Sequence, residues 1–269
     1  MGDLINGWGL TNASPMEGNY TGQFNNWMAD VAPIHNYSDG SGIPIYVVRG
    51  NHEDGPNQTV APLLSAYLAT AAAGMPANGP RGEERLTYSF THKGAKFVAN
   101  DNYIAHNGLK ETVNQSWVVG QLTQDTRPFT FVYGHSPAYA VVNDDEEDNY
   151  ALDAHPPQRD LFWNSLAENN VSAYFCGHAH LYARGESQGV QQIVSGNAVA
   201  HAIAFDPANV DPALVLESPK SAIAKKDQRI GYLVITVHES TGTFDGVEKQ
   251  LNPVTRAWET GDTFTLTAW

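Results

Sequence analysis

Two histidines separated by one residue, His178 and His180, could bind a metal ion through their ring nitrogens. They follow the short apolar run Val171–Phe175, which is rich in strand-forming residues and therefore predicts a buried strand. Gly177 lets the chain turn sharply after that strand and exposes both imidazole rings. Neutral imidazole suits transition metals, and ligands collect at the carboxyl ends of strands in α/β sheets. A loop with two surface histidines is the alternative interpretation of the same residues.

Three further loops repeat this arrangement of an apolar run, a glycine and a ligand side chain. They are Gly2-Asp3, Gly50-Asn51-His52 and Gly134-His135. Residues 43–48 and 129–133 precede the last two loops and predict buried strands, whereas only the end of such a run is visible before Asp3. A carboxylate, an amide oxygen and imidazoles together suit Zn, Mn or Fe better than Ca, which prefers oxygen ligands throughout. The loops therefore predict a metal centre at one edge of a sheet.

The order and spacing of these loops resemble the signature of the calcineurin-like metallophosphoesterases, which runs Gly-Asp, Gly-Asn-His-Glu/Asp, Gly-His and Gly-His-X-His. The resemblance extends from Gly2 to about Gly196, and a purple-acid-phosphatase-like branch of the superfamily is one option within it. It implies an α/β fold in which two sheets form a sandwich flanked by helices, in four layers. Asn6 stands where purple acid phosphatases carry a tyrosine, which argues against a tyrosine-ligated ferric site.

The resemblance also implies a role for each motif residue in a site that holds up to two divalent or transition metal ions, Mn, Zn or Fe. The implied metal ligands are Asp3, which would bridge both ions, with Asn51, His135 and His178 for one ion and His180 for the other. A metal-activated hydroxide would attack a phosphate ester, and His52 would be the general acid that protonates the leaving oxygen. Histidine suits this task because its pKa lies near neutrality. Glu53 is interpreted either as a partner that orients His52 or as a solvent-facing or capping residue.

The sequence departs from the family signature at its first motif, because no Asp-X-His precedes Gly2-Asp3. Asp153-Ala154-His155 matches the Asp-X-His motif, but it lies between an acidic run and two prolines and is interpreted as a surface loop. We therefore expect an N-terminally incomplete phosphoesterase domain that lacks the first strand and helix of the family, with impaired activity. The alternative is a non-catalytic or single-metal relative that acts as a binding module.

The predicted elements form one domain over residues 1–269. Apolar residues at helical spacing predict helices at 24–31, 59–75, 113–123 and 157–168. Alternating residues predict a hairpin of strands at 86–91 and 96–99. After His180 the pattern changes to strands at 192–194, 230–237, 241–247 and 263–268, interrupted only by an irregular loop with a short helix at 207–224. These later strands fit the second sheet of the family fold.

Composition narrows the class of partner. The chain carries 29 acidic and 15 basic residues, a formal charge of −14, which disfavours nucleic acid as a partner. No run approaches the roughly 18 apolar residues that a membrane span needs. Cys176 is the only cysteine, so no disulfide can form within the chain. We expect a small phosphate ester as substrate and leave the oligomeric state and the localisation open, with a secreted or periplasmic location favoured.

Overall fold

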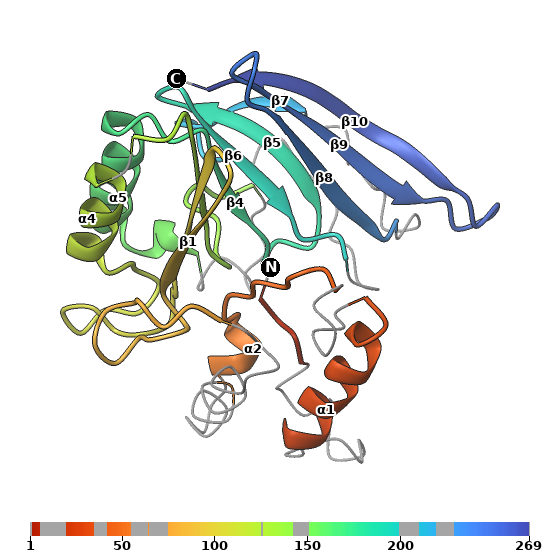
Figure 1. Ribbon diagram of the computed structural model, residues 1–269, viewed down its shortest axis with the longest axis horizontal. Helices are drawn as coiled ribbons and strands as arrows, with labels where there is room; N and C mark the ends of the chain where they lie inside the picture. The colour runs from red at the N-terminus through yellow and green to blue at the C-terminus, as the bar shows by residue number, and fades with distance from the viewer. Residues whose placement is uncertain are drawn as a thin grey trace.

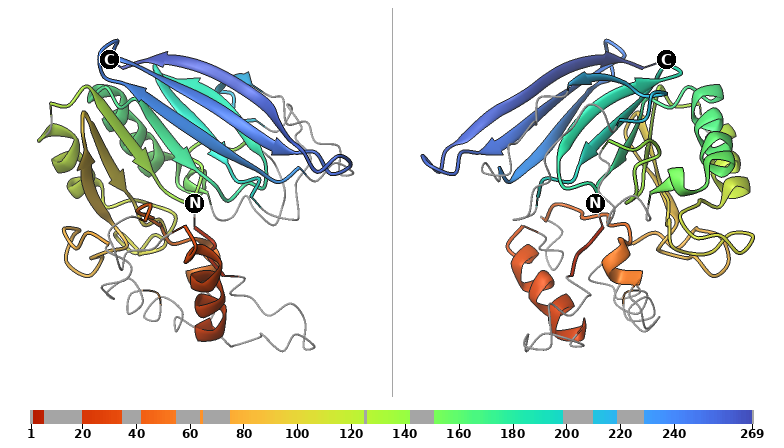
Figure 2. Two further views of the ribbon diagram at one scale, coloured as in Figure 1. Left: turned by 45° about the vertical axis from the view of Figure 1, so that its right-hand side comes forward. Right: turned by 180° about the vertical axis from the view of Figure 1, so that it is seen from behind.

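The computed structural model describes residues 2–5, 20–34, 42–54, 64, 75–124, 126–141, 151–198, 210–218 and 229–268, and these make up the fold drawn in Figure 1. Two β-sheets lie against each other, and helices flank the larger sheet, as Figures 1 and 2 show from three sides. Within this part of the chain, no helix is long and apolar enough to cross a membrane.

The larger sheet has seven strands in the order β1-β2-β3-β4-β6-β5-β7. Its strands are β1 (Tyr88–His92), β2 (Ala95–Ala99), β3 (Phe129–Tyr133), β4 (Ala173–Cys176), β5 (Tyr182–Ser187), β6 (Val190–Ser195) and β7 (Val215–Ser218). β2, β3, β4 and β6 run parallel, and Tyr133 pairs with Ala99 on one side and Phe175 on the other. The carboxyl ends of β2, β3 and β4 therefore lie level, and the loops that follow them open at the same edge of the sheet.

The smaller sheet is antiparallel, with the order β10-β9-β8. Its strands are β8 (Gly231–His238), β9 (Thr243–Leu251) and β10 (Trp258–Thr267). Side chains of β9 alternate between buried and half-buried, as expected for a strand with one face on the core. The ring of Phe244 lies 5.3 Å from that of Phe131 in the larger sheet, centroid to centroid. The Tyr182 hydroxyl donates to Asp262 at 2.9 Å, so aromatic packing and a buried hydrogen bond both join the two sheets.

The opposite face of the larger sheet is covered by α4 (Gln115–Thr123) and α5 (Pro156–Glu168), as Figure 1 shows. Successive residues of β3 point to opposite faces, so Val132 packs toward the helices and Phe131 toward the smaller sheet. Trp163 of α5 is fully buried, and its indole nitrogen donates to the carbonyl of Ser187 at 3.0 Å. This side of the sheet therefore holds the main hydrophobic core.

Two further helices lie near the edge where the loops open (Figure 1). They are α1 (Tyr20–Val31) and the single turn α2 (Asn51–Asp54). Phe24 of α1 is buried in a second core cluster with Ile5 and Val48. This cluster fixes the short N-terminal segment beside the segment that leads into α2.

Most of the predicted elements are confirmed. The helices predicted at 24–31, 113–123 and 157–168 correspond to α1, α4 and α5, and the strands at 129–133 and 171–175 to β3 and β4. β1 and β2 form the predicted antiparallel hairpin. The two sheets flanked by helices agree with the predicted fold class. The helix predicted at 59–75 lies outside the described residues except for Leu64, which is helical, and Met75.

The strand predicted at 43–48 was wrong. These residues pair with no strand in the described part of the chain, although Val47 and Val48 are buried. Side chains of β1 contact them: the Tyr88 hydroxyl donates to the carbonyl of Val47 at 2.7 Å, and Tyr46 stacks on Phe90. An apolar run shows that a segment is buried, but a strand also needs a neighbour for its backbone groups.

Two strands were missed. β5 was overlooked because Arg184, Gly185 and Glu186 interrupt its apolar pattern, yet Arg184 is buried because it pairs with Asp262 and Glu217. β7 lies where an irregular loop with a short helix was predicted at 207–224. The described residues 210–218 contain turns and this strand and no helix, which corrects that prediction for this range.

Candidate metal centre

The parallel strands β3 and β4 deliver His135 and His178 to the same edge of the sheet. The N–H of Gly177 donates to the carbonyl of His135 at 2.8 Å, which ties the two loops together. His178 has a φ of 61°, a left-handed conformation that residues other than glycine rarely adopt. Such strain persists where the surrounding structure enforces it, commonly at functional sites.

The N-terminal segment approaches these loops so closely that only glycine fits at two positions. Asp3 itself has a left-handed backbone with a φ of 53°. A Cβ on Gly2 would overlap the ring of His135, and a Cβ on Gly50 would overlap the Asp3 carboxylate. The glycines of both motifs therefore allow the ligand side chains to approach, in addition to turning the chain.

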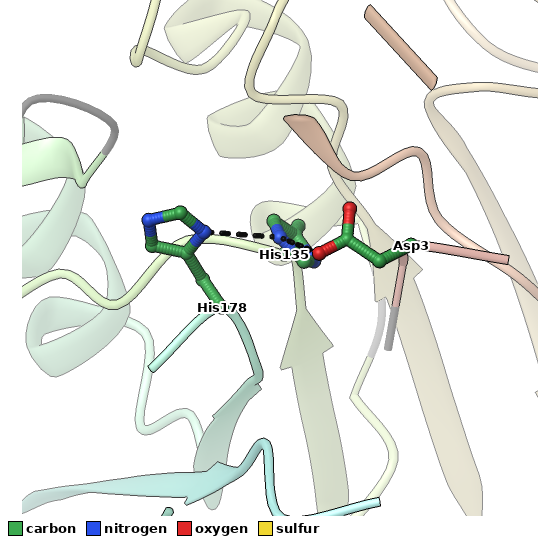
Figure 3. A group of neighbouring side chains, drawn as sticks. All are labelled: Asp3, His135 and His178. Atoms are coloured by element: carbon green, nitrogen blue, oxygen red, sulfur yellow. Dashed lines mark hydrogen bonds and ion pairs between the residues drawn. The ribbon is translucent and has the colours of Figure 1, made fainter. Parts of the chain in front are cut away.

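Asp3, His135 and His178 form one compact group, shown in Figure 3. Asp3 Oδ2 lies 3.2 Å from His135 Nε2, and His135 Nε2 lies 3.2 Å from His178 Nδ1. One ligand atom from each residue lies within 4.8 Å of the others. His135 and His178 are buried and Asp3 is half-buried. The geometry suits a cation, because one carboxylate and two imidazoles converge on one point.

Asn51 completes the group with its side-chain amide. Its Oδ1 atom lies 3.0 Å from His135 Nε2, 3.2 Å from His178 Nδ1 and 3.2 Å from both carboxylate oxygens of Asp3. Two forms of this arrangement are chemically sound. Without a cation, the amide nitrogen turns inward and donates to its neighbours. With a cation, the amide oxygen and the unprotonated ring nitrogens face the ion, so the residues present fit a divalent metal.

Glu53 holds the loops of Asp3 and Asn51 together. Its carboxylate is fully buried and accepts the backbone N–H groups of Asp3 at 2.9 Å, Ile5 at 3.0 Å and Gly50 at 2.7 Å. The bond from Gly50 is one half of a capping box at the start of α2. Glu53 therefore caps α2, which is one of the three predicted roles, and its role in orienting His52 stays a prediction. Its position is buried, so the solvent-facing alternative was wrong.

The two carboxylates of the centre differ in how easily they ionise. Burial alone would raise the pKa of Asp3, but its ion pair and hydrogen bond with His135, together with His52, outweigh burial and hold that pKa below its ordinary value. Burial and the nearby charge of Asp3 raise the pKa of Glu53. Asp3 is therefore the carboxylate that stays ionised, as a metal ligand must.

The remaining candidate residues lie around this group. His52 Nε2 lies 4.0 Å from Asp3 Oδ2, and its side chain is 27% exposed, so it borders the centre and reaches solvent. His180 is half-buried and does not belong to the compact group. Asp153 lies in the 3₁₀ turn η3 (Leu152–Ala154), and His155 is the N-cap residue that precedes α5. Neither is a member of the compact group.

Three residues that shape the centre had no role in the sequence analysis. Arg49 forms two hydrogen bonds with Asp101, at 2.7 and 2.8 Å, and both residues are buried. Asn102 accepts the N–H of His135 at 3.0 Å. A signal was present, because residues 100–102 are polar and directly follow the predicted strand at 96–99, at the edge where the ligands collect.

A sequence model of the calcineurin-like phosphoesterases matches residues 1–182, which is more than half of the chain and includes the compact group and Asn51. The chain therefore belongs to the calcineurin-like phosphoesterase family. Membership supports phosphoester hydrolysis in general and implies divalent metal ions. No curated protein compared with the chain matches it.

Solved structures support the same fold. The chain is similar to the purple acid phosphatase PPD1 from yellow lupin (Lupinus luteus), with a TM-score of 0.62 and 17% identity over 91% of this chain and 43% of that one. It is also similar to PhoD, with a TM-score of 0.61 and 13% identity over 100% of this chain and 63% of that one. The chain thus spans less than half of the lupin protein and less than two thirds of PhoD.

Proposed function

We propose that the chain hydrolyses a small phosphate ester at the centre built from Asp3, Asn51, His135 and His178. The observation that carries this proposal is the convergence of a carboxylate, an amide and two imidazoles within hydrogen-bonding distance of one another. A bound divalent ion would lower the pKa of water and stabilise negative charge on the phosphoryl oxygens. The net charge of −14 favours a small ester over a nucleic acid.

The protein side chains have separate roles in this proposal. Asp3 is ionised and supplies negative charge, while His135 and His178 would each offer one ring nitrogen to the ion. His180 is proposed as a ligand of a second ion with Asp3. His52 borders the group and is partly exposed, so its ring can reach the leaving oxygen of an ester and protonate it.

The test is hydrolysis of p-nitrophenyl phosphate and bis-p-nitrophenyl phosphate by protein stripped with EDTA and reloaded with Mn²⁺, Zn²⁺ or Fe²⁺. Activity should disappear on stripping and return on reloading. His135→Ala should abolish the returned activity, whereas His92→Ala should keep it, because His92 lies exposed on β1. Hydrolysis that survives both EDTA and His135→Ala would refute the proposal.

A second candidate is a single-metal relative that binds without catalysis. The position of His180 outside the compact group favours it, because a second ion would then have fewer ligands in the described part of the chain. This candidate predicts about one tightly bound ion together with no turnover of either ester. Metal-dependent turnover would exclude it.

A further inference from the structure

We propose that Asp101 and Asn102 are positioning residues that set the distance between the ligand loops of Asn51 and His135. This inference rests on the proposed function, because it concerns the same metal centre. The two residues follow β2, whose carboxyl end lies level with that of β3. They lie between the two ligand loops and contact both.

Asn102 holds the His135 loop. It is fully buried, and its Oδ1 accepts the N–H of His135 at 3.0 Å and that of Ser136 at 3.1 Å. Two consecutive N–H groups on one oxygen fix the direction in which the chain leaves β3. A Cβ on Gly134 would lie 2.9 Å from this oxygen, so the glycine before His135 makes room for Asn102.

Asp101 holds the Asn51 loop. Arg49 lies two residues before Asn51 and contacts both oxygens of Asp101, Nη2 to Oδ1 at 2.7 Å and Nε to Oδ2 at 2.8 Å. Planar bidentate pairing of this kind fixes orientation as well as distance. The Oδ1 atom also accepts the N–H groups of Tyr103 and Ile104 at 2.8 and 2.7 Å, which fixes the turn that presents Asn102.

The turn at Asp101 and Asn102 therefore determines the distance between the amide of Asn51 and the imidazole of His135. Asn51 Oδ1 and His135 Nε2 lie 3.0 Å apart although 84 residues separate them in the sequence. The shift of either loop would move one of these atoms relative to the other. Outer-shell partners commonly change metal affinity by about 10–100-fold without touching the ion.

A purely structural role for these buried polar groups is the competing explanation, and the chain offers a matched control. Asn100 is of the same type, 1% exposed, and its side-chain oxygen and nitrogen have no hydrogen-bond partner among the described residues. Asn100→Ala therefore removes a buried side chain of equal size from the same segment and leaves the bonds to His135 intact. Asn102→Asp is the conservative variant, because it keeps an oxygen that can accept both N–H groups.

The experiment measures Mn²⁺ affinity by calorimetry and the visible spectrum of Co²⁺-loaded protein for the parent chain and the three variants. Asn102→Ala should weaken Mn²⁺ binding at least tenfold and shift the Co²⁺ bands. Asn100→Ala should stay within about twofold of the parent, and Asn102→Asp should bind more tightly than Asn102→Ala. If Asn102→Ala does not fold, Asn102→Ser takes its place, because its shorter side chain cannot hold both N–H groups.

Histidine ring signals in NMR spectra of the metal-free variants give a second measurement. The signals of His135 should move in Asn102→Ala and remain in place in Asn100→Ala. Unchanged signals and affinity in Asn102→Ala, or equal losses in both alanine variants, would overturn the inference. A parent chain that binds Mn²⁺ but hydrolyses no ester would refute the proposed function alone, since the affinity and NMR comparisons do not use turnover.

Discussion

Glu53 accepts the backbone N–H of Asp3 at 2.9 Å across 50 residues of sequence. The same carboxylate accepts the N–H of Gly50, one residue before Asn51. A side chain that is not a member of the compact group therefore holds the backbones of two ligand loops together. The arrangement explains how Asp3, which lies outside both sheets, can keep a fixed distance from His135.

Replacing Glu53 by glutamine should destabilise the protein. The amide of glutamine has only one acceptor oxygen, so at least one of the three buried N–H groups that Glu53 binds would face a donor. An unsatisfied buried group costs about 1–3 kcal/mol, and we expect the free energy of unfolding to fall by that amount. Urea denaturation measures it. Glu84→Gln, at an exposed position elsewhere in the chain, is the control and should change the unfolding free energy little.

Removal of a metal ligand should reduce metal content strongly. We expect the parent chain to bind nearer one equivalent than two, because only one compact ligand group is present in the described residues. His178→Ala should lower the affinity for this ion by about 100-fold or more. Loss of an outer-shell partner alone lowers metal affinity by about 10–100-fold. Elemental analysis after desalting gives the stoichiometry. Two tightly bound ions would show that a ligand has been assigned wrongly.

Replacing His52 should lower kcat most for substrates whose leaving oxygen must be protonated as it departs. General acid catalysis contributes about 100- to 10,000-fold, so His52→Ala should lower kcat for an alkyl phosphate by at least about 100-fold. The loss should be far smaller for p-nitrophenyl phosphate, whose leaving oxygen departs readily without a proton. Steady-state kinetics on both esters provides the comparison. Equal losses on both would assign His52 to metal binding or packing.

The pair of Glu83 and His106 should make stability depend on acid pH. Burial by itself would raise the pKa of Glu83, but hydrogen bonds from His106, Asn114 and Thr87 outweigh it and lower that pKa below its ordinary value of 4.5. The unfolded chain therefore takes up a proton first as the pH falls. The stability that Glu83 contributes is complete above about pH 4.5 and is lost progressively below it.

Urea midpoints measured between pH 7 and pH 3 test this dependence. Glu83→Gln should lower the midpoint most at pH 7, and the difference from the parent chain should shrink toward pH 3. Glu84→Gln provides the matched control, because the neighbouring carboxylate is exposed and accepts the N–H of Gly82, two residues earlier in the chain. A constant difference across this range would contradict a role for the charge of Glu83.

Local sequence patterns were sufficient to predict those elements whose burial follows from their own composition. β3 is a run of five buried residues and agrees with its predicted bounds, and Pro156 opens α5 one residue before the predicted start. The convergence of His135 and His178 was predictable as well, because consecutive parallel strands end at one edge. Arg184 shows the limit, since its burial depends on Asp262, 78 residues away.

The candidate site also has a part that the sequence predicted and a part that it did not. Asp3, Asn51, His135 and His178 were predicted from motifs, and the structure brings them together. The supporting residues were not, because Asp101 and Asn102 act through hydrogen bonds to backbone groups on other loops. Such bonds need only an acceptor at the right place, and sequence spacing does not reveal where a backbone N–H will lie.

The level ends of β2, β3 and β4 also determine when during folding the metal centre can form. Asn51 and His135 are separated by 84 residues and His135 and His178 by 43, so no two of these ligands meet through local structure. Contacts at such separations form slowly, because the chain must close long loops before they contribute. The metal centre would therefore form late in refolding, so that metal uptake reports a late stage. A growing chain would acquire its ion only after His178 had left the ribosome.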